Sequence, residues 1–336
     1  AKVSASKKNR KGWVMRNIIQ FVVVVATLFV LQVVPQQSFA GEGKAILVTG
    51  ASTGIGRHLA EALAAEGYHV YAGARKDKDL AELNTIENVT AVRLDVTKQD
   101  QIDAAVDKVR ADGGGLYALV NNAGVGGGDF VADTPIDDQS FVYRVNVEGV
   151  YRTTKAFAPL LIESKGRIVT TGSIAGTVSW PGGSAYSGSK HWIEAFTDAL
   201  AGEMAEHGVS VSVVEPGNYK SNIRRTSVAR EHEKMKASGG ELTEEMKEAY
   251  EKTAERELSY KEPDEVTEAF MHALFSDAPL LRYMVVPNKR EAEITIGTKI
   301  NELVQLNQWS PHGFSRDELV QMLDAALSPE AEAAGE

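Results

Sequence analysis

The chain has 336 residues and a formal net charge of −10 at neutral pH. Residues 1–40 carry six of its 36 basic residues and none of its 46 acidic ones, so the remainder stands at −16, which argues against nucleic acid as a partner. Cysteine is absent, which excludes disulfides, thiolate catalysis and sulfur-ligated metal sites. The length suits one large α/β domain with appendages.

The first 40 residues combine a basic leader, an apolar run of 17 residues over 18–34 and the small-x-small ending Ser38-Phe39-Ala40. These are the parts of a secretory signal peptide, although the run is long for that role and short for a membrane span. We expect membrane association through this segment, as an uncleaved anchor or as a signal peptide. Positive charge before the run predicts that the rest of the chain lies on the far side of the membrane.

A first βα unit follows the leader. Residues 44–49 predict a short buried strand, and a glycine-rich turn opens directly into the helical pattern of Ile55, Leu59 and Leu63. The spacing Gly-x-x-x-Gly-x-Gly is a variant of the dinucleotide fingerprint, in which glycines let the backbone approach a pyrophosphate at a helix N-terminus. An ordinary glycine-rich turn is the alternative. The candidate cofactor contacts here are Gly50, Ser52, Thr53, Gly54, Ile55 and Gly56.

The second predicted strand, residues 69–74, ends at Ala74 and is followed by Arg75. An NAD enzyme would have a carboxylate here for the ribose hydroxyls, whereas the planar fork of an arginine suits a 2′-phosphate. The alternative is a solvated arginine in the charged turn 76–79. We therefore expect NADP in preference to NAD, with Arg75 as a cofactor contact.

The remaining pattern alternates strands and helices. This order is typical of a doubly wound parallel sheet of the Rossmann type, so the expected fold class is α/β. We expect one catalytic domain over 41–290. The predicted strands are 90–94, 116–121, 167–171, 210–215 and 282–286, and the predicted helices are 99–112, 140–161 and 185–207.

Three residues in this pattern suggest chemistry. Tyr186 and Lys190 stand four apart at the start of a predicted helix, so both side chains share one face. A phenol is a poor base near neutral pH, but a fixed ammonium one turn away favours the phenolate and lowers the pKa of the tyrosine. Ser173 follows a predicted strand, where open α/β sheets bind their ligands, and could donate a hydrogen bond to a substrate carbonyl.

With these pieces assembled, the chain resembles the classical short-chain dehydrogenases/reductases over residues 44–287. Asn146, Ser173, Tyr186 and Lys190 occur in the order and spacing of that family's catalytic tetrad. The resemblance implies that Lys190 bonds the nicotinamide ribose and that Asn146 holds a water linking the lysine to solvent. By itself, Asn146 would indicate a helix-kinking or capping asparagine.

The resemblance also supplies further cofactor contacts. Asp95-Val96 resembles the family's adenine-contacting pair, and Asn121-Asn-Ala-Gly124 resembles its signature after the fourth strand. The segment from Pro216 to Ser221 is similar to the one that holds the nicotinamide. The contacts implied in this way are Asp95, Val96, Asn122, Ala123, Gly124, Tyr186, Lys190, Pro216, Gly217, Tyr219 and Ser221.

Two appendages follow. Residues 219–260 are rich in charge and lie where the resembled family has its substrate lid, so we expect a mobile helical cover, with a solvated charged hairpin as the alternative. Residues 291–336 predict a helical extension of the core with a disordered tail. The apolar stripe of helix 185–207 indicates core or subunit contact, and the resemblance implies a homodimer or homotetramer.

The sequence therefore predicts an NADP(H)-preferring oxidoreductase that interconverts an alcohol and a ketone or aldehyde, with Tyr186 as acid or base. Two alternatives stay open: an NADP-binding redox-sensing or scaffold protein without turnover, and a nucleotide-sugar epimerase or dehydratase. No metal is expected, because His191 and Glu194 offer the only near-ligand spacing. The expected partner is a small carbonyl or alcohol. A reductase needs a supply of nicotinamide cofactor, which favours the cytosol. The leader predicts the opposite side, so the side of the membrane stays open.

Overall fold

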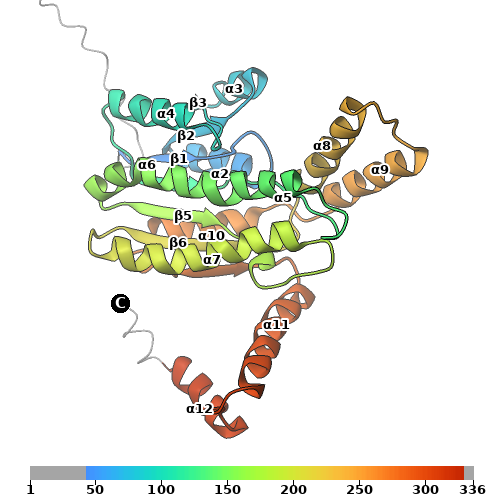
Figure 1. Cartoon of the computed structure of the whole chain (residues 1–336). Helices are drawn as coiled ribbons and strands as arrows, with labels where there is room; N and C mark the ends of the chain where they lie inside the picture. The colour runs from blue at the N-terminus through green and yellow to red at the C-terminus, as the bar shows by residue number, and fades with distance from the viewer. Residues whose placement is uncertain (1–42, 329–336) are drawn as a thin grey trace, which may run out of the picture. The chain divides into compact units, whose positions relative to one another are not determined.

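A parallel sheet of seven strands forms the centre of the fold (Figure 1). The computed structural model describes residues 43–328. The strand order is β3-β2-β1-β4-β5-β6-β7, and every neighbouring pair is parallel, which confirms the predicted doubly wound sheet. The strands are β1 (Ala45–Val48), β2 (His69–Ala74), β3 (Val89–Arg93), β4 (Ala118–Asn121), β5 (Arg167–Thr171), β6 (Ser210–Pro216) and β7 (Arg282–Val285).

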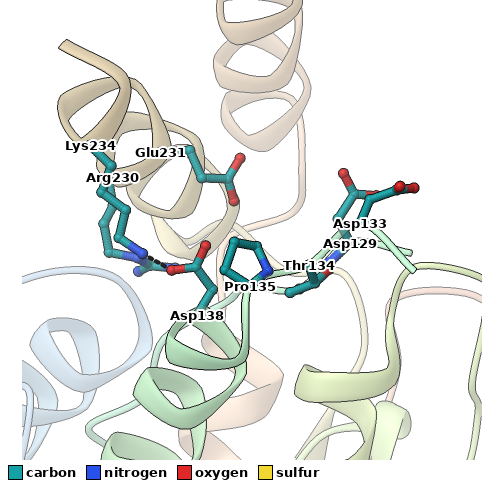
Figure 2. Close-up of a pocket in the computed structure, with 10 residues that line it drawn as sticks. Asp129, Asp133, Thr134, Pro135, Asp138, Arg230, Glu231 and Lys234 are labelled. Carbon is teal, nitrogen blue, oxygen red and sulfur yellow. Dashed lines mark hydrogen bonds and ion pairs between the residues drawn. The ribbon is translucent and has the colours of Figure 1, made fainter. Parts of the chain in front are cut away.

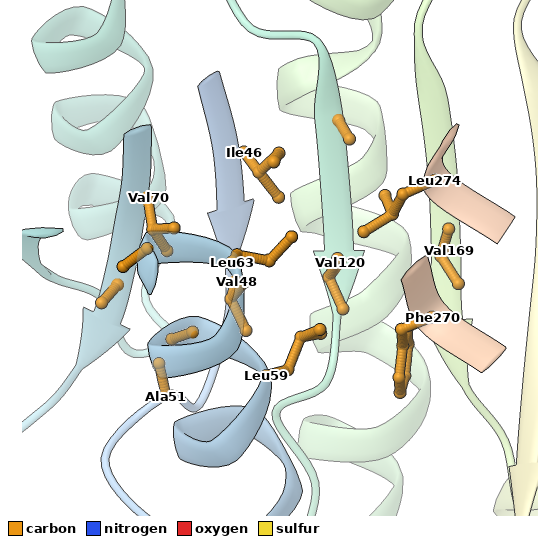
Figure 3. Packing of buried hydrophobic residues seen from close by; sticks show 14 of the residues in the cluster. Ile46, Val48, Ala51, Leu59, Leu63, Val70, Val120, Val169, Phe270 and Leu274 are labelled. Carbon is orange, nitrogen blue, oxygen red and sulfur yellow. The ribbon is translucent and has the colours of Figure 1, made fainter. Parts of the chain in front are cut away.

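Helices cover both faces of the sheet because its central strands are apolar on both sides. Every residue of β1 is buried, as is typical of a parallel strand between two helical layers. On one face Leu59, Leu63 and Phe270 pack against the sheet (Figure 3), and each such side chain stabilises the fold by about 1.5–3 kcal/mol. The helices are α2 (Gly54–Ala65) and α10 (Asp264–Phe275) on this face, α4 (Gln99–Ala111), α6 (Gly149–Ser164) and α7 (Ser184–Ala205) on the other, and the short α3 (Asp77–Leu83) after β2.

The strand order reverses direction between β1 and β4. Open α/β sheets bind ligands in the crevice outside the carboxyl ends of the strands at such a switch point. The glycine-rich turn after β1 and the Asn121-Asn-Ala-Gly124 segment after β4 both begin there. The fold therefore brings the two predicted cofactor motifs to one edge.

A π-helical turn interrupts the helix predicted over 140–161. α5 (Ile136–Tyr143) runs into a π-helix at Arg144–Glu148, and α6 continues from there. Single π-turns inside α-helices are frequent at functional sites. Asn146 lies within this turn and is 1 % exposed.

The segment predicted as a lid forms a helical hairpin of α8 (Ile223–Ala237) and α9 (Glu244–Leu258). The buried carboxylate of Glu257 accepts hydrogen bonds from the backbone N–H groups of Arg224 at 2.7 Å and Arg225 at 3.0 Å. A carboxylate in this position satisfies N–H groups that the helix itself leaves free. Its negative charge also interacts favourably with the positive end of the helix dipole. Glu257 of α9 therefore caps α8 and holds the hairpin together.

The C-terminal extension consists of α11 (Lys289–Gln308) and α12 (Arg316–Ala326). Thr295 is its only buried helical residue, and Trp309 between the helices is 96 % exposed. The extension is helical, and its apolar side chains join neither buried cluster of the sheet.

Within residues 43–328, no helix combines the length and the apolar character that crossing a membrane requires. The predicted leader, residues 1–40, and all of the predicted disordered tail, residues 328–336, except Ser328 lie outside the described residues.

Candidate active site

The turn after β1 and the loop after β4 interlock. Thr49 Oγ1 accepts hydrogen bonds from the backbone N–H groups of Asn122 and Ala123, both at 2.9 Å. The Asn122 amide donates in return to the carbonyls of Thr49 at 3.0 Å and Gly50 at 3.2 Å. A Cβ on Gly50 would come within 2.8 Å of the Ala123 Cα, and Gly50 has a φ of +66°. Both the space and the dihedral angle therefore require glycine.

The N-terminus of α2 has no side-chain cap. Its N-cap residue, Thr53, makes no capping hydrogen bond, so N–H groups of the first turn stay available to a ligand. These groups and the positive end of the helix dipole favour an anion. A Cβ on Gly54 would lie 3.5 Å from Ser221, and one on Gly56 would overlap the Asn122 amide. This glycine cradle fits the pyrophosphate of a dinucleotide, and Ser52 and Ile55 lie partly exposed beside it.

Arg75 is exposed just beyond the end of β2. Among residues 43–328 its guanidinium has no hydrogen-bond or ion-pair partner, since Asp77, the nearest acid along the chain, pairs with Arg93. Lys78 pairs with Glu82 in the same turn. The charged turn therefore leaves Arg75 free to bind an anionic group of a ligand.

Asp95 and Val96 follow β3 at the same edge of the sheet. Asp95 Oδ1 accepts hydrogen bonds from the backbone N–H of Thr97 at 3.0 Å and from its hydroxyl at 2.7 Å. Val96 is buried against Gly149 at the start of α6, where a Cβ would come within 3.0 Å of the valine Cβ. These contacts hold in place the loop that the family resemblance predicts to contact the adenine.

Ser173 and Tyr186 are brought together from two elements. Ser173 lies in the loop after β5 and Tyr186 in the first turn of α7, and the Ser173 hydroxyl is near enough to the Tyr186 phenol to lower its pKa. The Ser173 hydroxyl also accepts a hydrogen bond from the Ala175 N–H at 3.1 Å and donates one to the Pro216 carbonyl at 3.4 Å. The serine is therefore held at the carboxyl ends of β5 and β6.

Lys190 lies one turn farther along α7 and is 5 % exposed. Its Nζ donates a hydrogen bond to the Thr171 carbonyl at 2.7 Å and lies 5.8 Å from the centroid of the Tyr186 ring. Burial lowers the pKa of Lys190 to about 8, and the Glu194 carboxylate opposes this shift. The side chain is therefore still predominantly an ammonium at neutral pH.

The expectation that Lys190 lowers the pKa of Tyr186 is not met in this structure. Burial raises the pKa of Tyr186, and the opposing effects come from the neighbouring Ser173 hydroxyl and from the charge of Arg224. Desolvation dominates because a phenolate loses more hydration in this site than its neighbours restore. The phenol of Tyr186 is therefore protonated at neutral pH.

Asn146 bridges the loop after β4 and helix α7. Its Oδ1 accepts a hydrogen bond from the Val125 N–H at 2.9 Å, and its Nδ2 donates to the Val125 carbonyl and the Ser189 hydroxyl, both at 3.0 Å. Both N–H groups of the amide thus have protein partners. A water at this residue would have to bond to one of its oxygen atoms.

The residues after β6 contact different parts of the structure. Gly217 packs against Glu291 of α11. Tyr219 is 3 % exposed, packs in the buried cluster with α2 and α10, and donates a hydrogen bond to Glu265. The core and Glu265 engage the side chain of Tyr219, so a cofactor contact at this residue would come from its backbone.

A cavity of about 210 Å³ lies between α8 and the loop after β4 (Figure 2). Arg230 of α8 donates a hydrogen bond to the Gly126 carbonyl at 2.7 Å, and Lys234 pairs with Asp138 of α5. These contacts hold α8 against the loop and against α5. Neither Tyr186 nor Ser173 lines this cavity.

Several residues near Tyr186 were missed by sequence reasoning. The Trp180 ring lies with its centroid 6.5 Å from that of Tyr186, and Arg224 of the lid acts on the phenol through its charge. Nothing in the sequence predicts that Trp180 or Arg224 lies near Tyr186. Trp180 is brought there by the loop before α7, and Arg224 by the position of α8. Glu194 had a signal, because it stands four residues after Lys190 on the same helix.

A doubly wound sheet with a glycine cradle at its switch point, and a tyrosine beside a serine at the same edge, defines a nicotinamide-dependent oxidoreductase as the class of protein. Comparison with known proteins agrees: the profile of the short chain dehydrogenase family matches residues 44–232. The chain belongs to the short-chain dehydrogenase/reductase family, and it is an oxidoreductase that acts on CH–OH groups with NAD or NADP.

The D-beta-hydroxybutyrate dehydrogenase, mitochondrial, of Rattus norvegicus is 35 % identical over 267 residues, which cover 74 % of this chain and 78 % of that protein. A short chain dehydrogenase/reductase from Burkholderia phymatum in complex with NAD superposes with a TM-score of 0.66 at 26 % identity, covering 81 % of this chain and 98 % of the other. A variant of the actinorhodin polyketide ketoreductase with NADPH gives a TM-score of 0.61 at 30 % identity, covering 72 % and 95 %. These similarities support alcohol–ketone interconversion, and the two structures differ in the cofactor that they contain.

Proposed function

We propose that this chain is an NADP(H)-preferring oxidoreductase that interconverts an alcohol and a ketone or aldehyde, with Tyr186 as the acid or base. The observation that carries the proposal is the meeting of Tyr186, Ser173 and Lys190 at the carboxyl end of β5, where the Lys190 Nζ lies 5.8 Å from the centroid of the Tyr186 ring and the Ser173 hydroxyl acts on the phenol. A substrate oxygen that contacts both hydroxyls would meet a hydrogen-bond donor and a proton source at once.

In the reductive direction, Ser173 orients the substrate carbonyl and Tyr186 gives its proton to the carbonyl oxygen. When bound, the nicotinamide cofactor supplies the hydride to the carbonyl carbon. The Ser173 hydroxyl and the charge of Arg224 stabilise the phenolate that remains, and the buried ammonium of Lys190, held by the Thr171 carbonyl, would bond the cofactor ribose. The raised pKa of Tyr186 suits this direction, because it keeps the phenol protonated until a substrate is present.

The cofactor preference is supported by Arg75. The exposed guanidinium has no acidic partner in its turn, and a 2′-phosphate would provide one through charge-assisted hydrogen bonds. We propose that the rest of the cofactor lies along the glycine cradle. The proposed contacts are Gly50, Ser52, Thr53, Gly54, Ile55, Gly56, Asp95, Val96, Asn122, Ala123, Gly124, Pro216, Gly217 and Ser221.

The test is a panel of carbonyls and alcohols, followed at the nicotinamide absorbance with the full chain and both cofactors. We expect turnover of at least one pair, with kcat/KM at least about tenfold higher for NADPH than for NADH. Tight NADPH binding without turnover across the panel would favour a scaffold protein. Equal kcat/KM values for the two cofactors would remove the NADP preference.

We further propose a homo-oligomer formed through α6 and α7. Tyr151 of α6 is 53 % exposed, and its ring lies 6.3 Å from that of Phe196, on which Trp192 of α7 stacks at 4.7 Å. Exposed aromatic clusters of this kind are typical of protein interfaces. Sedimentation of the full chain tests this, and a monomer at micromolar concentration would contradict it.

Membrane association through residues 1–40 remains a proposal as well, and the side of the membrane stays open. Its test is fractionation of the full chain beside a chain that begins at residue 41. Equal recovery of both in the soluble fraction would contradict the proposal.

A further inference from the structure

Two carboxyl groups lie directly beneath the loop that carries Ser173: Glu215 is buried, and Glu194 is partly buried with its Oε1 enclosed. Glu194 comes from α7, one turn beyond Lys190, and Glu215 comes from β6, directly before Pro216. A Cβ on Gly172 would lie 3.2 Å from Glu194 Oε1 and 3.3 Å from Glu215 Cγ. A Cβ on Gly176 would lie 2.9 Å from the same Glu194 oxygen. The two carboxyls therefore occupy the space left by the glycines that flank the Ser173 loop.

The hydrogen bonding of Glu194 is complete only if a proton is present. Its Oε2 accepts a hydrogen bond from Arg282 Nε at 3.1 Å. Its Oε1 is buried and, among the described residues, has no N–H or O–H partner while both carboxyls are ionised. Its neighbour at Gly172 is the side chain of Glu215, and two carboxylates offer only acceptors, so a hydrogen bond between the two groups requires that one of them carries a proton. A proton on Glu215 supplies the donor that Glu194 Oε1 lacks.

The surroundings favour this arrangement over two carboxylates. Arg282 also donates to Asp198 at 2.6 Å, so its single positive charge is divided between two acids. Burial and the neighbouring Glu194 raise the pKa of Glu215 to about 7. The charged groups that face the pair are Lys190 and Asp198 of α7, Arg282 of β7 and Lys299 of α11.

We infer that Glu194 and Glu215 share one proton and act as positioning residues, so that turnover at the proposed active site depends on that proton. This inference rests on the proposed function. With the proton present, a hydrogen bond joins α7 to β6 beneath Ser173. Without the proton, the two adjacent carboxylates repel each other, and this repulsion acts on the Ser173 loop, which both side chains contact. The shared proton stays in the pair and is not the one transferred to the substrate.

The pair also acts on Lys190. Glu194 raises the pKa of that lysine against the effect of burial. Loss of the shared proton adds negative charge near the Lys190 ammonium, and negative charge favours the ammonium form. The lysine therefore keeps its proton when the pair loses its own, and the two ionisations are separable. We expect kcat for carbonyl reduction to fall first with the pair, near pH 7, and then with Lys190, near pH 8.

The test compares kcat between about pH 6 and about pH 9 for the full chain and for Glu215→Gln. The glutamine amide donates to Glu194 at every pH, so this variant should keep kcat at about pH 6 within about twofold and move the alkaline limb upward by about one unit. The matched control is Glu203→Gln, an exposed position of the same helix, which should leave the limb unchanged. An unshifted limb in Glu215→Gln would overturn the inference.

A second measurement requires no turnover, which keeps the inference separable from the proposed function. Infrared spectra of the unmodified protein should show a protonated-carboxyl band that disappears between about pH 6 and about pH 8. Glu194→Gln removes the carboxylate that raises the pKa of Glu215, so it should move this loss to lower pH. If the unmodified protein shows no such band, or if Glu194→Gln leaves its titration unchanged, the shared proton is refuted, whether or not a substrate is known.

Discussion

The side-chain amide of Asn146 donates a hydrogen bond of 3.0 Å to the hydroxyl of Ser189. This bond joins the π-helical turn to α7 directly before Lys190. The same amide bonds both backbone groups of Val125 in the loop after β4. One buried asparagine therefore fixes three segments of the candidate site relative to one another, which explains a polar residue at 1 % exposure.

Replacing this asparagine should cost more than replacing its partner. Asn146→Ala leaves the partly buried backbone groups of Val125 unpaired, so we predict a loss of about 1–3 kcal/mol in the free energy of unfolding and at least a tenfold fall in kcat. Ser189→Ala removes one bond and should cost about 0.5–1.5 kcal/mol. Urea denaturation and steady-state kinetics measure both effects. Equal losses in the two variants would show that the bridge to Val125 contributes nothing.

Arg75 should discriminate between the two cofactors. We predict that Arg75→Ala raises KM for NADPH about tenfold or more, because charge-assisted hydrogen bonds to a phosphate are each worth about 1.5–3 kcal/mol. KM for NADH should stay within about twofold. Lys76→Ala, at the exposed neighbouring position, is the control. The assignment fails if Arg75→Ala weakens both cofactors equally.

The glycine cradle can be tested with a matched pair of substitutions. Gly50 and Gly113 both have positive φ, +66° and +75°, but only Gly50 lacks room for a Cβ. Gly113→Ala should therefore show only the cost of the dihedral angle, about 1 kcal/mol. Gly50→Ala should cost more and abolish dinucleotide binding, measured by calorimetry. Intact binding in Gly50→Ala would contradict the cradle.

The Glu215 carboxyl should make stability depend on pH. Its pKa is raised from 4.5 to about 7 in the folded chain, so between these values the folded state holds a proton that the unfolded state has lost. Stability therefore falls as the pH rises through this window and levels off above it. Denaturant titrations at several pH values should show this slope, and Glu215→Gln should reduce it. A slope of opposite sign in the unmodified protein would contradict the raised pKa.

Much of the fold was predictable because local pattern and global fold agree. Apolar runs such as 44–49 and 167–171 are strands in the structure, and the spacing of Gly50, Gly54 and Gly56 fixed the first βα turn. The Tyr186–Lys190 spacing likewise placed both residues on one helix. These features depend on periodicity and turn chemistry, which a single sequence carries.

The features that were missed depend on contacts between distant segments. Asn146 lies in a π-turn, and the burial of Tyr219 follows from packing against α2 and α10. The proximity of Lys190 along the helix predicted a lowered pKa for Tyr186, whereas burial by the folded chain raises it. The exposed apolar side chains of α11 and α12 carry a core-like pattern without joining the core.

The central claim is that the Tyr186 phenol supplies the proton that accompanies hydride transfer. Its most direct test is kcat of Tyr186→Phe for carbonyl reduction, with NADPH affinity measured on the same preparation. The account predicts a fall in kcat of about 10²–10⁴-fold with NADPH affinity unchanged, because the phenyl ring keeps the shape of the site and loses only the proton. Turnover like that of the unmodified protein would contradict it.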